Sequence, residues 1–404
     1  MRALLALLLS GAALAQTSGR WDTTLFIALG DGLPAGMGDF GLHQRYQERS
    51  FPALVAAQMK ALFPQPLLEA PGLGGIPGYP DLPVRAPGPL GTTLRTPFPP
   101  TLFVFNLSVP GMKAAGASSI RVRPPLVHPA DMQQTALNFI VGFPSLLLGK
   151  DKPLSTQVEA AVSLNPTSVL ICYGYSDVLD AAAAGDPALL PDPAAFRSAY
   201  QRVVDPIRAT FARILIVNIP DPMDSAYAIT PAAAGRYLNV TPARIQTWWR
   251  AGTSDFITPA GLLAMGEQLD NGTPGAALPN GSVIAAAAAT AIRDRVTALN
   301  REIAAVAQGA GADLHDLAAL IRRVREGGAA AGGVTLTADY MGGFYTLNGF
   351  YPGNAGNAII ANDILTGINR RYSTQFPMVD LAGIVRDDPS SSRLRPSSSK
   401  GESR

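Results

Sequence analysis

The stretch from 23 to 38, TTLFIALGDGLPAGMG, constrains the fold more than any other part of the chain. Its apolar run LFIAL at 25–29 is rich in strand-forming residues, which predicts a buried strand. The run ends at GDG (30–32), where the chain must turn, and LPAG (33–36) carries a proline of the kind that the first turn of a helix tolerates. In an open α/β sheet such a junction lies at the carboxyl ends of the strands, where ligands bind.

Further apolar runs predict four more strands, at 102–107, 168–173, 213–219 and 312–314. Helical patterns accompany them, at 51–62, 155–164, 194–211, 284–306 and 354–368. Strands that alternate with helices favour a doubly wound, mainly parallel sheet with helices on both faces. We therefore expect an α/β fold built on five strands.

The first residues predict a signal peptide at 1–15. Met1-Arg2 precedes an apolar run, and small residues end in ALA at 13–15, a pattern typical of signal cleavage. The run is too short for a membrane span, and no later run reaches the roughly 20 apolar residues that a span needs. We expect an exported protein, secreted or periplasmic, without a transmembrane segment.

One domain at 16–385 accounts for the rest of the pattern. Two irregular insertions are expected in it, at about 64–100, which is dense in proline and glycine, and at about 223–281. From 386 to 404 the chain is rich in serine, proline and arginine, which predicts a disordered tail.

Composition excludes several classes of function. The formal net charge of +2 over 404 residues gives no reason to expect nucleic acid as a partner. Cys172 is the only cysteine and lies in an apolar run, so we expect an inert core thiol and no disulfide. The three histidines are far apart, so no metal site is predicted, and we expect no cofactor.

Four short blocks resemble the SGNH/GDSL hydrolase family. GDGL at 30–33, NLSVPG at 106–111, GYSD at 174–177 and NGFYP at 348–352 match the family's blocks in order and approximate spacing. The resemblance covers most of the chain. It implies a flavodoxin-like sheet of five strands and the ancestry of an ester hydrolase, a lipase or acylhydrolase.

The same resemblance shows that the family's triad is substituted. Gly32 stands in place of the serine, Ser176 in place of the GxND asparagine, and Asn348 and Tyr351 in place of the DxxH pair. Glycine offers no nucleophile, asparagine carries no charge, and a phenol with a pKa near 10 is a poor base. Loss of the serine or histidine alone costs roughly 10⁶ in turnover. We expect a protein that is inactive as a serine esterase.

Groups that bind without reacting are still expected in the old cleft. The resemblance places the backbone N–H groups of Gly32 and Gly111 as oxyanion donors, with Ser176 beside them, Asp31 in the turn and Tyr351 as an aromatic wall. These residues suit an acylated, ester-bearing or glycan ligand. The competing interpretation is that Tyr351 fills the cleft and leaves it vestigial.

Ester hydrolysis by a rearranged site is the main alternative. Ser108 or Ser176 would serve as nucleophile and His315 as base. Ser108 is otherwise expected to be a loop-capping hydroxyl and His315 a structural histidine. A carboxylate mechanism through Asp31, Asp39 or Asp177 is a further alternative, although Asp31 and Asp177 match family positions that shape turns.

A dinucleotide site is the remote alternative. GDGLPA at 30–35 satisfies the G-x-G-x-x-G/A fingerprint. The fingerprint also needs an acidic residue that ends a second strand about 20 residues later. Glu48 has the spacing, but its surroundings are polar and helical in character.

Overall fold

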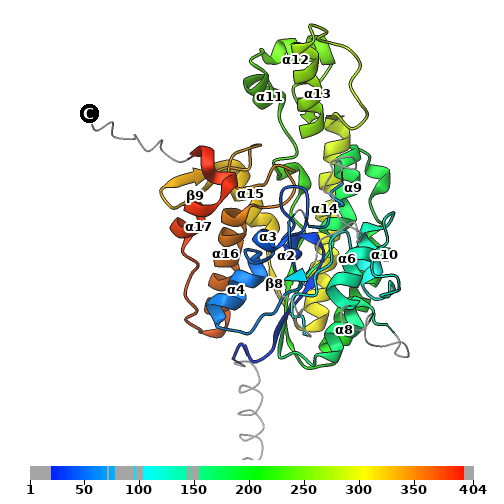
Figure 1. The fold of residues 1–404 in the computed structure, drawn as a ribbon, viewed down its shortest axis with the longest axis vertical. Coiled ribbons are helices and arrows are strands. Elements are labelled where there is room, and N and C mark those ends of the chain that lie inside the picture. The colour runs from blue at the N-terminus through cyan, green and yellow to red at the C-terminus, as the bar shows by residue number, and fades with distance from the viewer. Residues whose placement is uncertain are drawn as a thin grey trace, which may run out of the picture.

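Four parallel strands form the central sheet of the computed structural model, which describes residues 20–70, 72–77, 95–96, 103–142, 146 and 154–394 (Figure 1). The sheet order is β1-β4-β5-β8, and the strands are β1 (Phe26–Gly30), β4 (Ser168–Cys172), β5 (Arg213–Val217) and β8 (Asp313–His315). All four lie where apolar runs predicted strands, and the residues of β1 and β4 are buried throughout.

The fifth predicted strand, at 102–107, was wrong for the residues that the structure describes. Asn106 makes a single parallel bridge to Ala28, on the side of β1 opposite β4. Val109 N still donates to Gly30 O at 3.0 Å, so the chain continues beside β1 after this bridge. The Leu107 carbonyl, however, accepts from the Gln157 side chain at 2.6 Å instead of from β1, and the segment forms no regular strand.

Helices cover both faces of the sheet, as the alternation predicted (Figure 1). The pair α4 (Phe51–Met59) and α16 (Asn354–Tyr372) packs together on one side, and α8 (Gln157–Ser163), α10 (Pro193–Arg208) and α14 (Ala286–Ala310) lie on the other. The apolar stripe of α14 is buried at every position that its helical spacing predicted, namely Ile292, Val296, Leu299, Ile303 and Val306.

Shorter elements connect these layers. Other helices are α2 (Gly32–Ala35), α3 (Gln44–Gln47), α5 (Ala114–Ala117), α6 (Met132–Leu137), α9 (Tyr175–Ala184), α15 (Leu317–Gly327) and α17 (Leu381–Asp387). Two-stranded ladders join β2 (Leu67–Leu68) to β3 (Arg95–Thr96) and β9 (Ala329–Ala331) to β10 (Val334–Leu336). The first ladder lies inside the predicted insertion at 64–100, most of which is outside the described residues.

The second predicted insertion is helical rather than irregular. It contains α11 (Pro231–Leu238), α12 (Pro242–Trp249) and α13 (Pro259–Asp270), and β6 (Phe256–Ile257) pairs with β7 (Val283–Ile284) at its base. Residues 229–284, here called the helical lobe, project from one end of the body and have their own apolar cluster (Figure 1). Each lobe helix begins with Thr-Pro, in which the threonine hydroxyl caps the first turn and the proline occupies the first helical position.

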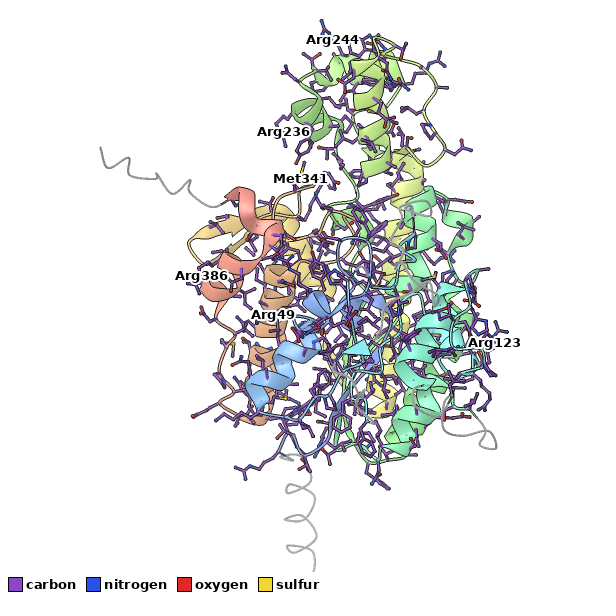
Figure 2. All side chains as sticks on the ribbon, in the orientation of Figure 1. Arg49, Arg123, Arg236, Arg244, Met341 and Arg386 are labelled. Atoms are coloured by element: carbon purple, nitrogen blue, oxygen red, sulfur yellow. The ribbon has the colours of Figure 1, made fainter. Side chains whose placement is uncertain are left out.

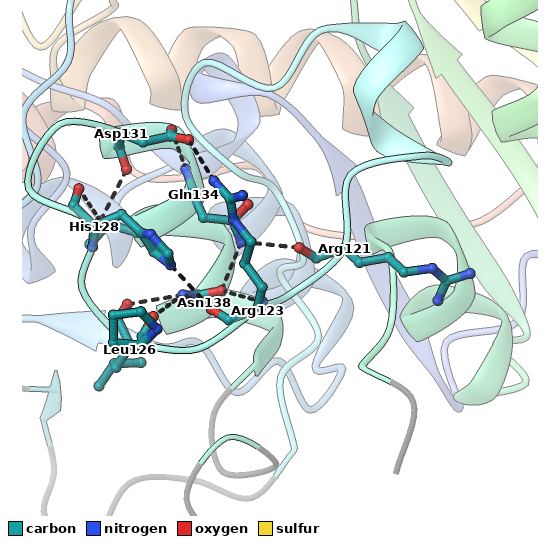
Figure 3. A network of polar contacts seen from close by, with 9 residues as sticks. Arg121, Arg123, Leu126, His128, Asp131, Gln134 and Asn138 are labelled. Atoms are coloured by element: carbon teal, nitrogen blue, oxygen red, sulfur yellow. Dashed lines mark hydrogen bonds and ion pairs between the residues drawn. The ribbon is translucent and has the colours of Figure 1, made fainter. Parts of the chain in front are cut away.

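A buried amide fixes the loop between α5 and α6. The Nδ2 of Asn138 donates to the carbonyl oxygens of Arg123, Pro125 and Leu126 at 2.8–3.1 Å, and its Oδ1 accepts from Gln134 Nε2 at 2.9 Å (Figure 3). His128 belongs to the same network, because its Nε2 lies 3.2 Å from the carbonyl oxygen of Arg123. This histidine is therefore structural.

Both ends of the chain were predicted to lie outside the folded domain. The predicted signal peptide at 1–15 lies outside the described residues. The tail was expected to lose order at Arg386, but α17 and a 3₁₀ segment (Pro389–Leu394) continue the fold, with Asp388 and Ser391 buried. Among the described helices, none has the length and apolar character that a membrane crossing requires.

Candidate functional site

The turn after β1 is held by its own aspartate. Asp31 is the N-cap of α2, and its carboxylate accepts the backbone N–H of Leu33 at 3.0 Å and of Ser176 at 2.8 Å. Gly30 is required here because a Cβ atom would lie 2.3 Å from the carbonyl oxygen of Cys172 on β4. The sequence was right that Asp31 shapes this turn, and the turn brings Asp31 and Ser176 together.

The start of α9 supplies Ser176 and Asp177. Gly174 precedes the helix at φ +111°. The Asp177 carboxylate accepts the backbone N–H of Ala114 at 2.9 Å, so it joins α9 to the segment that carries the NLSVPG block. Ser176 is 6% exposed, and its hydroxyl lies close enough to the Tyr351 phenol to lower the pKa of that group, although within the described part of the chain it makes no hydrogen bond of normal geometry.

Tyr351 occupies the space in front of Gly32. A Cβ atom built on Gly32 would lie 2.7 Å from the Tyr351 hydroxyl oxygen and 3.1 Å from Met37 Cγ. The Tyr351 side chain is only 2% exposed, and its ring meets that of Tyr175 edge-on at 5.9 Å. A side chain at position 32 and the tyrosine at 351 therefore compete for one volume.

Asn348 organises the loop that presents Tyr351. Its Oδ1 accepts the backbone N–H groups of Phe350 at 2.7 Å and Tyr351 at 2.9 Å, and its Nδ2 donates to Thr346 Oγ1 at 2.8 Å and to the carbonyl oxygen of Asp39. The side chain is fully buried. An amide, with both donors and acceptors, satisfies this set of partners, whereas a carboxylate would have no donor for the two oxygens.

Gly111 lies in a more open position. It adopts φ +74°, and a Cβ atom there would have Gln133 as its nearest contact, at 3.8 Å. Val109 N donates to Gly30 O at 3.0 Å, so this block runs beside the end of β1. No described residue accepts a hydrogen bond from the backbone N–H of Gly32 or Gly111.

Sequence reasoning missed Gln157, which ties two of the blocks together. This fully buried side chain donates from Nε2 to Gly30 O at 2.7 Å and to Leu107 O at 2.6 Å. Its place in the first turn of α8, one residue after the Thr156 cap, was the only available signal. Gln157 fixes how far the two backbones stand apart.

Burial dominates the electrostatics of the site. It raises the pKa of Asp31 to about 7, although the two N–H donors oppose this, and it raises the pKa of Asp177 to about 6. Burial, with the neighbouring Asp31 charge, also raises the pKa of the Tyr351 phenol far above its ordinary value. At neutral pH the phenol is a proton donor and cannot act as a base.

A small hollow lies beside the Asn348 loop. This rim pocket, of about 120 Å³, is lined by Asp39, Met341, Tyr345, Thr346, Leu347, Pro389 and Ser390. Leu347 is 47% exposed, and its backbone N–H donates to Asp39 Oδ1 at 3.4 Å. Met341 lies where the body faces the helical lobe (Figure 2).

The other candidate residues are placed elsewhere or are structural. His315 lies on the edge strand β8 beside Asp363, and no described contact joins it to either candidate serine. Ser108 was expected to cap a loop, but its buried hydroxyl has no partner among the described residues. Cys172 is a buried free thiol, as predicted.

Glu48 does not complete a dinucleotide fingerprint. It is the C-cap of α3, where it accepts a hydrogen bond from Gln44 Nε2 at 2.8 Å, and it does not end a strand. The helix that follows the glycines, α2, is only one turn long. The geometry that a bound pyrophosphate needs is therefore absent from this part of the described chain.

Comparison with known proteins gives a distant likeness. No family model and no curated protein matches the chain. Among solved structures, the chain is similar to the crystal structure of an acetyl xylan esterase, AlAXEase, at 12% sequence identity and a TM-score of 0.34, over 85% of this chain and 98% of that one. The chemistry of the site therefore has to follow from this chain's own residues.

Proposed function

We propose that this chain is a diverged relative of the SGNH/GDSL hydrolases that no longer hydrolyses esters and instead binds an acylated, ester-bearing or glycan ligand at the old cleft. The observation that carries the proposal is the 2.7 Å between the Tyr351 hydroxyl and the place where a Cβ of residue 32 would stand. The serine that the family needs and this tyrosine cannot occupy their positions together without movement.

The residues at the family's triad positions have structural roles in this chain. Asn348 is committed to two backbone N–H groups and two oxygens, so it supports the loop rather than a base. Tyr351 is protonated and buried. A hydrolytic triad needs a nucleophile, a base and a group that orients the base, and the residues at these three positions supply none of them.

Two features support binding. The unpartnered N–H groups of Gly32 and Gly111 suit a carbonyl oxygen. The rim pocket offers an apolar volume next to the same loop, with Leu347 and Met341 in its wall. An acyl chain in the rim pocket with its carbonyl directed toward the cleft uses both features.

Hydrolysis by a rearranged site is the second candidate, and the buried hydroxyl of Ser176, which lies beside the Tyr351 phenol, is the observation that favours it. Activation of this hydroxyl requires a nearby base. The adjacent Asp31 already accepts backbone N–H groups on both of its oxygens. We therefore rank binding above a Ser176 nucleophile.

The leader pattern supports export. We propose that residues 1–15 are removed and that the mature protein works in the periplasm or outside the cell.

Hydrolysis of short p-nitrophenyl esters by the mature protein tests the catalytic part of the proposal. The wild type should not hydrolyse these esters. The variant with Gly32→Ser, Ser176→Asn, Asn348→Asp and Tyr351→His should hydrolyse them. The matched control carries the last three substitutions and keeps Gly32, so activity that needs a nucleophile at 32 must be absent from it. Turnover by wild type that Ser176→Ala abolishes would instead establish the second candidate.

Saturation-transfer NMR with p-nitrophenyl butyrate tests the binding part. We expect transfer to the butyryl protons in wild type and its loss in Leu347→Asp. Leu263→Asp, at a 65% exposed leucine of the lobe, is the control and should retain binding. Absence of transfer in wild type would overturn ligand binding at the rim pocket while leaving the loss of catalysis untouched.

A further inference from the structure

A second, larger cavity lies at the open edge of the sheet, away from the Gly32 site. It measures about 670 Å³, and it is bordered by the edge strand β8 and the helices α15 and α16. Its floor includes Leu215, Ile364 and Ile368, and its polar wall carries charged side chains of both signs. Neither the proposed function nor the resemblance to the hydrolases gives this cavity a role.

The centre of the polar wall is a histidine–carboxylate pair. His315 Nε2 lies 3.4 Å from Asp363 Oδ2, and Arg323 Nη2 lies 3.5 Å from Asp363 Oδ1. The His315 side chain is 9% exposed, and its Nε2 has no hydrogen bond of normal geometry within the described part of the chain. A buried imidazole nitrogen without a good partner is costly unless another group engages the pair.

The carboxylates of the wall are already satisfied by protein groups. Asp313 accepts from Arg371 Nε at 3.2 Å and from the Tyr372 hydroxyl. Asp316 Oδ1 accepts from Asn218 Nδ2 at 2.8 Å and from the backbone N–H of Ala319 at 3.0 Å. These aspartates offer little to an incoming cation.

The arginines, in contrast, have donors to spare. Arg323 and Arg371 each use one described ion pair, and Arg370 has none in the part of the chain that the structure describes. A guanidinium carries several N–H donors in a planar fork that fits carboxylates and phosphates. The cavity wall therefore has an excess of guanidinium donors over the acceptors that the described ion pairs give them.

From this excess we infer that the β8-edge cavity is a second binding site, for a small molecule that bears a carboxylate or phosphate group. Arg323, Arg370 and Arg371 contact the anionic group, and the apolar floor takes the rest of the molecule. His315 lies beside Asp363, and its protonation responds to the bound charge. This site is independent of the Gly32 cleft.

Charge balance couples binding to protonation. The wall carries three arginines and three aspartates, so with neutral His315 it is formally neutral and a bound anion leaves it negative. The charged groups that face His315 are Asp363 from α16, Asp316 at the end of β8 and Arg323 from α15. Burial lowers the pKa of free His315. An added negative charge favours the imidazolium, so binding raises this pKa and tightens as pH falls.

Histidine NMR provides a direct test, since the chain has three histidines and two lie elsewhere. The pH titration of the three imidazole C2 protons is followed in chloride, inorganic phosphate and citrate at one ionic strength. We expect phosphate, citrate or both to raise the pKa of His315 by about one unit, with His43 and His128 unmoved. A shift in phosphate alone assigns the phosphate class, and a shift in citrate alone assigns the carboxylate class. No shift, or equal shifts of all three histidines, overturns the inference.

Arginine variants locate the site. Arg323→Gln and Arg370→Gln should each weaken the binding of whichever anion shifts the His315 pKa. The expected loss is about tenfold in affinity, because one charge-assisted hydrogen bond is removed. The control is Arg386→Gln, because Arg386 is 76% exposed, lies on α17 (Figure 2) and is not among the residues that line this cavity. A weakening by Arg386→Gln as large as that by Arg323→Gln would also overturn the inference.

Discussion

Gly32→Ser should destabilise the protein because Tyr351 fills the adjoining space. The backbone of Gly32 is not in the left-handed region, so a side chain is sterically allowed by the main chain itself. A serine should even gain about 0.5 kcal/mol of helix propensity over glycine. The new Cβ, however, would meet the Tyr351 hydroxyl at 2.7 Å and both Tyr351 Cζ and Met37 Cγ at 3.1 Å.

The magnitude follows from overpacking in a buried site. Inserted atoms in a well-packed core cost about 1–3 kcal/mol, so Gly32→Ser should lower the free energy of unfolding by about that amount. Tyr351→Phe removes the closest of the three contacts. In that background the cost of Gly32→Ser should fall by about 1 kcal/mol or more, which is the coupling expected of residues in contact.

Urea unfolding of the four proteins of this double-mutant cycle measures the coupling. Gly309→Ser is the matched control, because Gly309 lies inside α14 and no atom stands within 4 Å of the place that its Cβ would take. The same substitution there should be neutral or slightly stabilising. If Gly32→Ser costs the same with and without the Tyr351 hydroxyl, the two positions do not compete for space and the reasoning fails.

Three further predictions concern the same structure. Because burial raises the folded-state pKa of Asp31 to about 7 and of Asp177 to about 6, the stability they confer is complete below about pH 4 and is lost as pH rises through 6 to 7. Urea midpoints should therefore fall as pH rises from about 4 to about 7, and Asp31→Asn should flatten this fall. Asn348→Asp removes the donor to Thr346 and should lower the free energy of unfolding by about 1–3 kcal/mol at neutral pH. The loss should be smaller at acidic pH, where the new carboxyl is protonated. An equal loss at both pH values contradicts the assigned bonds. Ile245→Ala, at a fully buried lobe residue, should speed amide exchange in 229–284 and leave the central strands protected, whereas faster exchange in the central strands would show that the lobe does not open by itself.

The sequence predicted the central sheet well because burial and strand pattern coincide there. Four apolar runs became β1, β4, β5 and β8. At 102–107 the described residues run beside β1 but make only one bridge, because the Gln157 side chain takes the Leu107 carbonyl. Periodicity does not register a side chain that replaces a ladder bond.

The helical lobe was missed although its signals were present. Thr230-Pro231, Thr241-Pro242 and Thr258-Pro259 each start a helix, with the threonine hydroxyl accepting a backbone N–H of the first turn. Scattered prolines and small polar residues indicate an irregular chain, whereas a proline at the first helical position is favoured. The cap residue before each proline was the distinguishing feature.

The order of the site blocks could be predicted, but the packing between them could not. Spacing along the chain placed Gly32 and Tyr351 in two blocks that resemble those of the hydrolase family. Only the fold shows that the Tyr351 phenol lies against Gly32. Gln157 escaped notice for the same reason, because its partners are carbonyl oxygens 50 and 127 residues away.

Under the proposed function, these contacts explain why the block pattern would persist after the loss of catalysis. Asp31 caps α2 and holds the start of α9, Asp177 holds α5, and Asn348 closes its own loop on Asp39. Each of these polar side chains is buried and satisfies backbone groups, so its removal costs stability whether or not a reaction takes place. Position 32 has no such structural duty. A serine there contributes only a nucleophile, and once Tyr351 fills the space, glycine is the residue that packs. Under the proposed function, the fold would retain the residues that packing needs and lose the one that only catalysis needs.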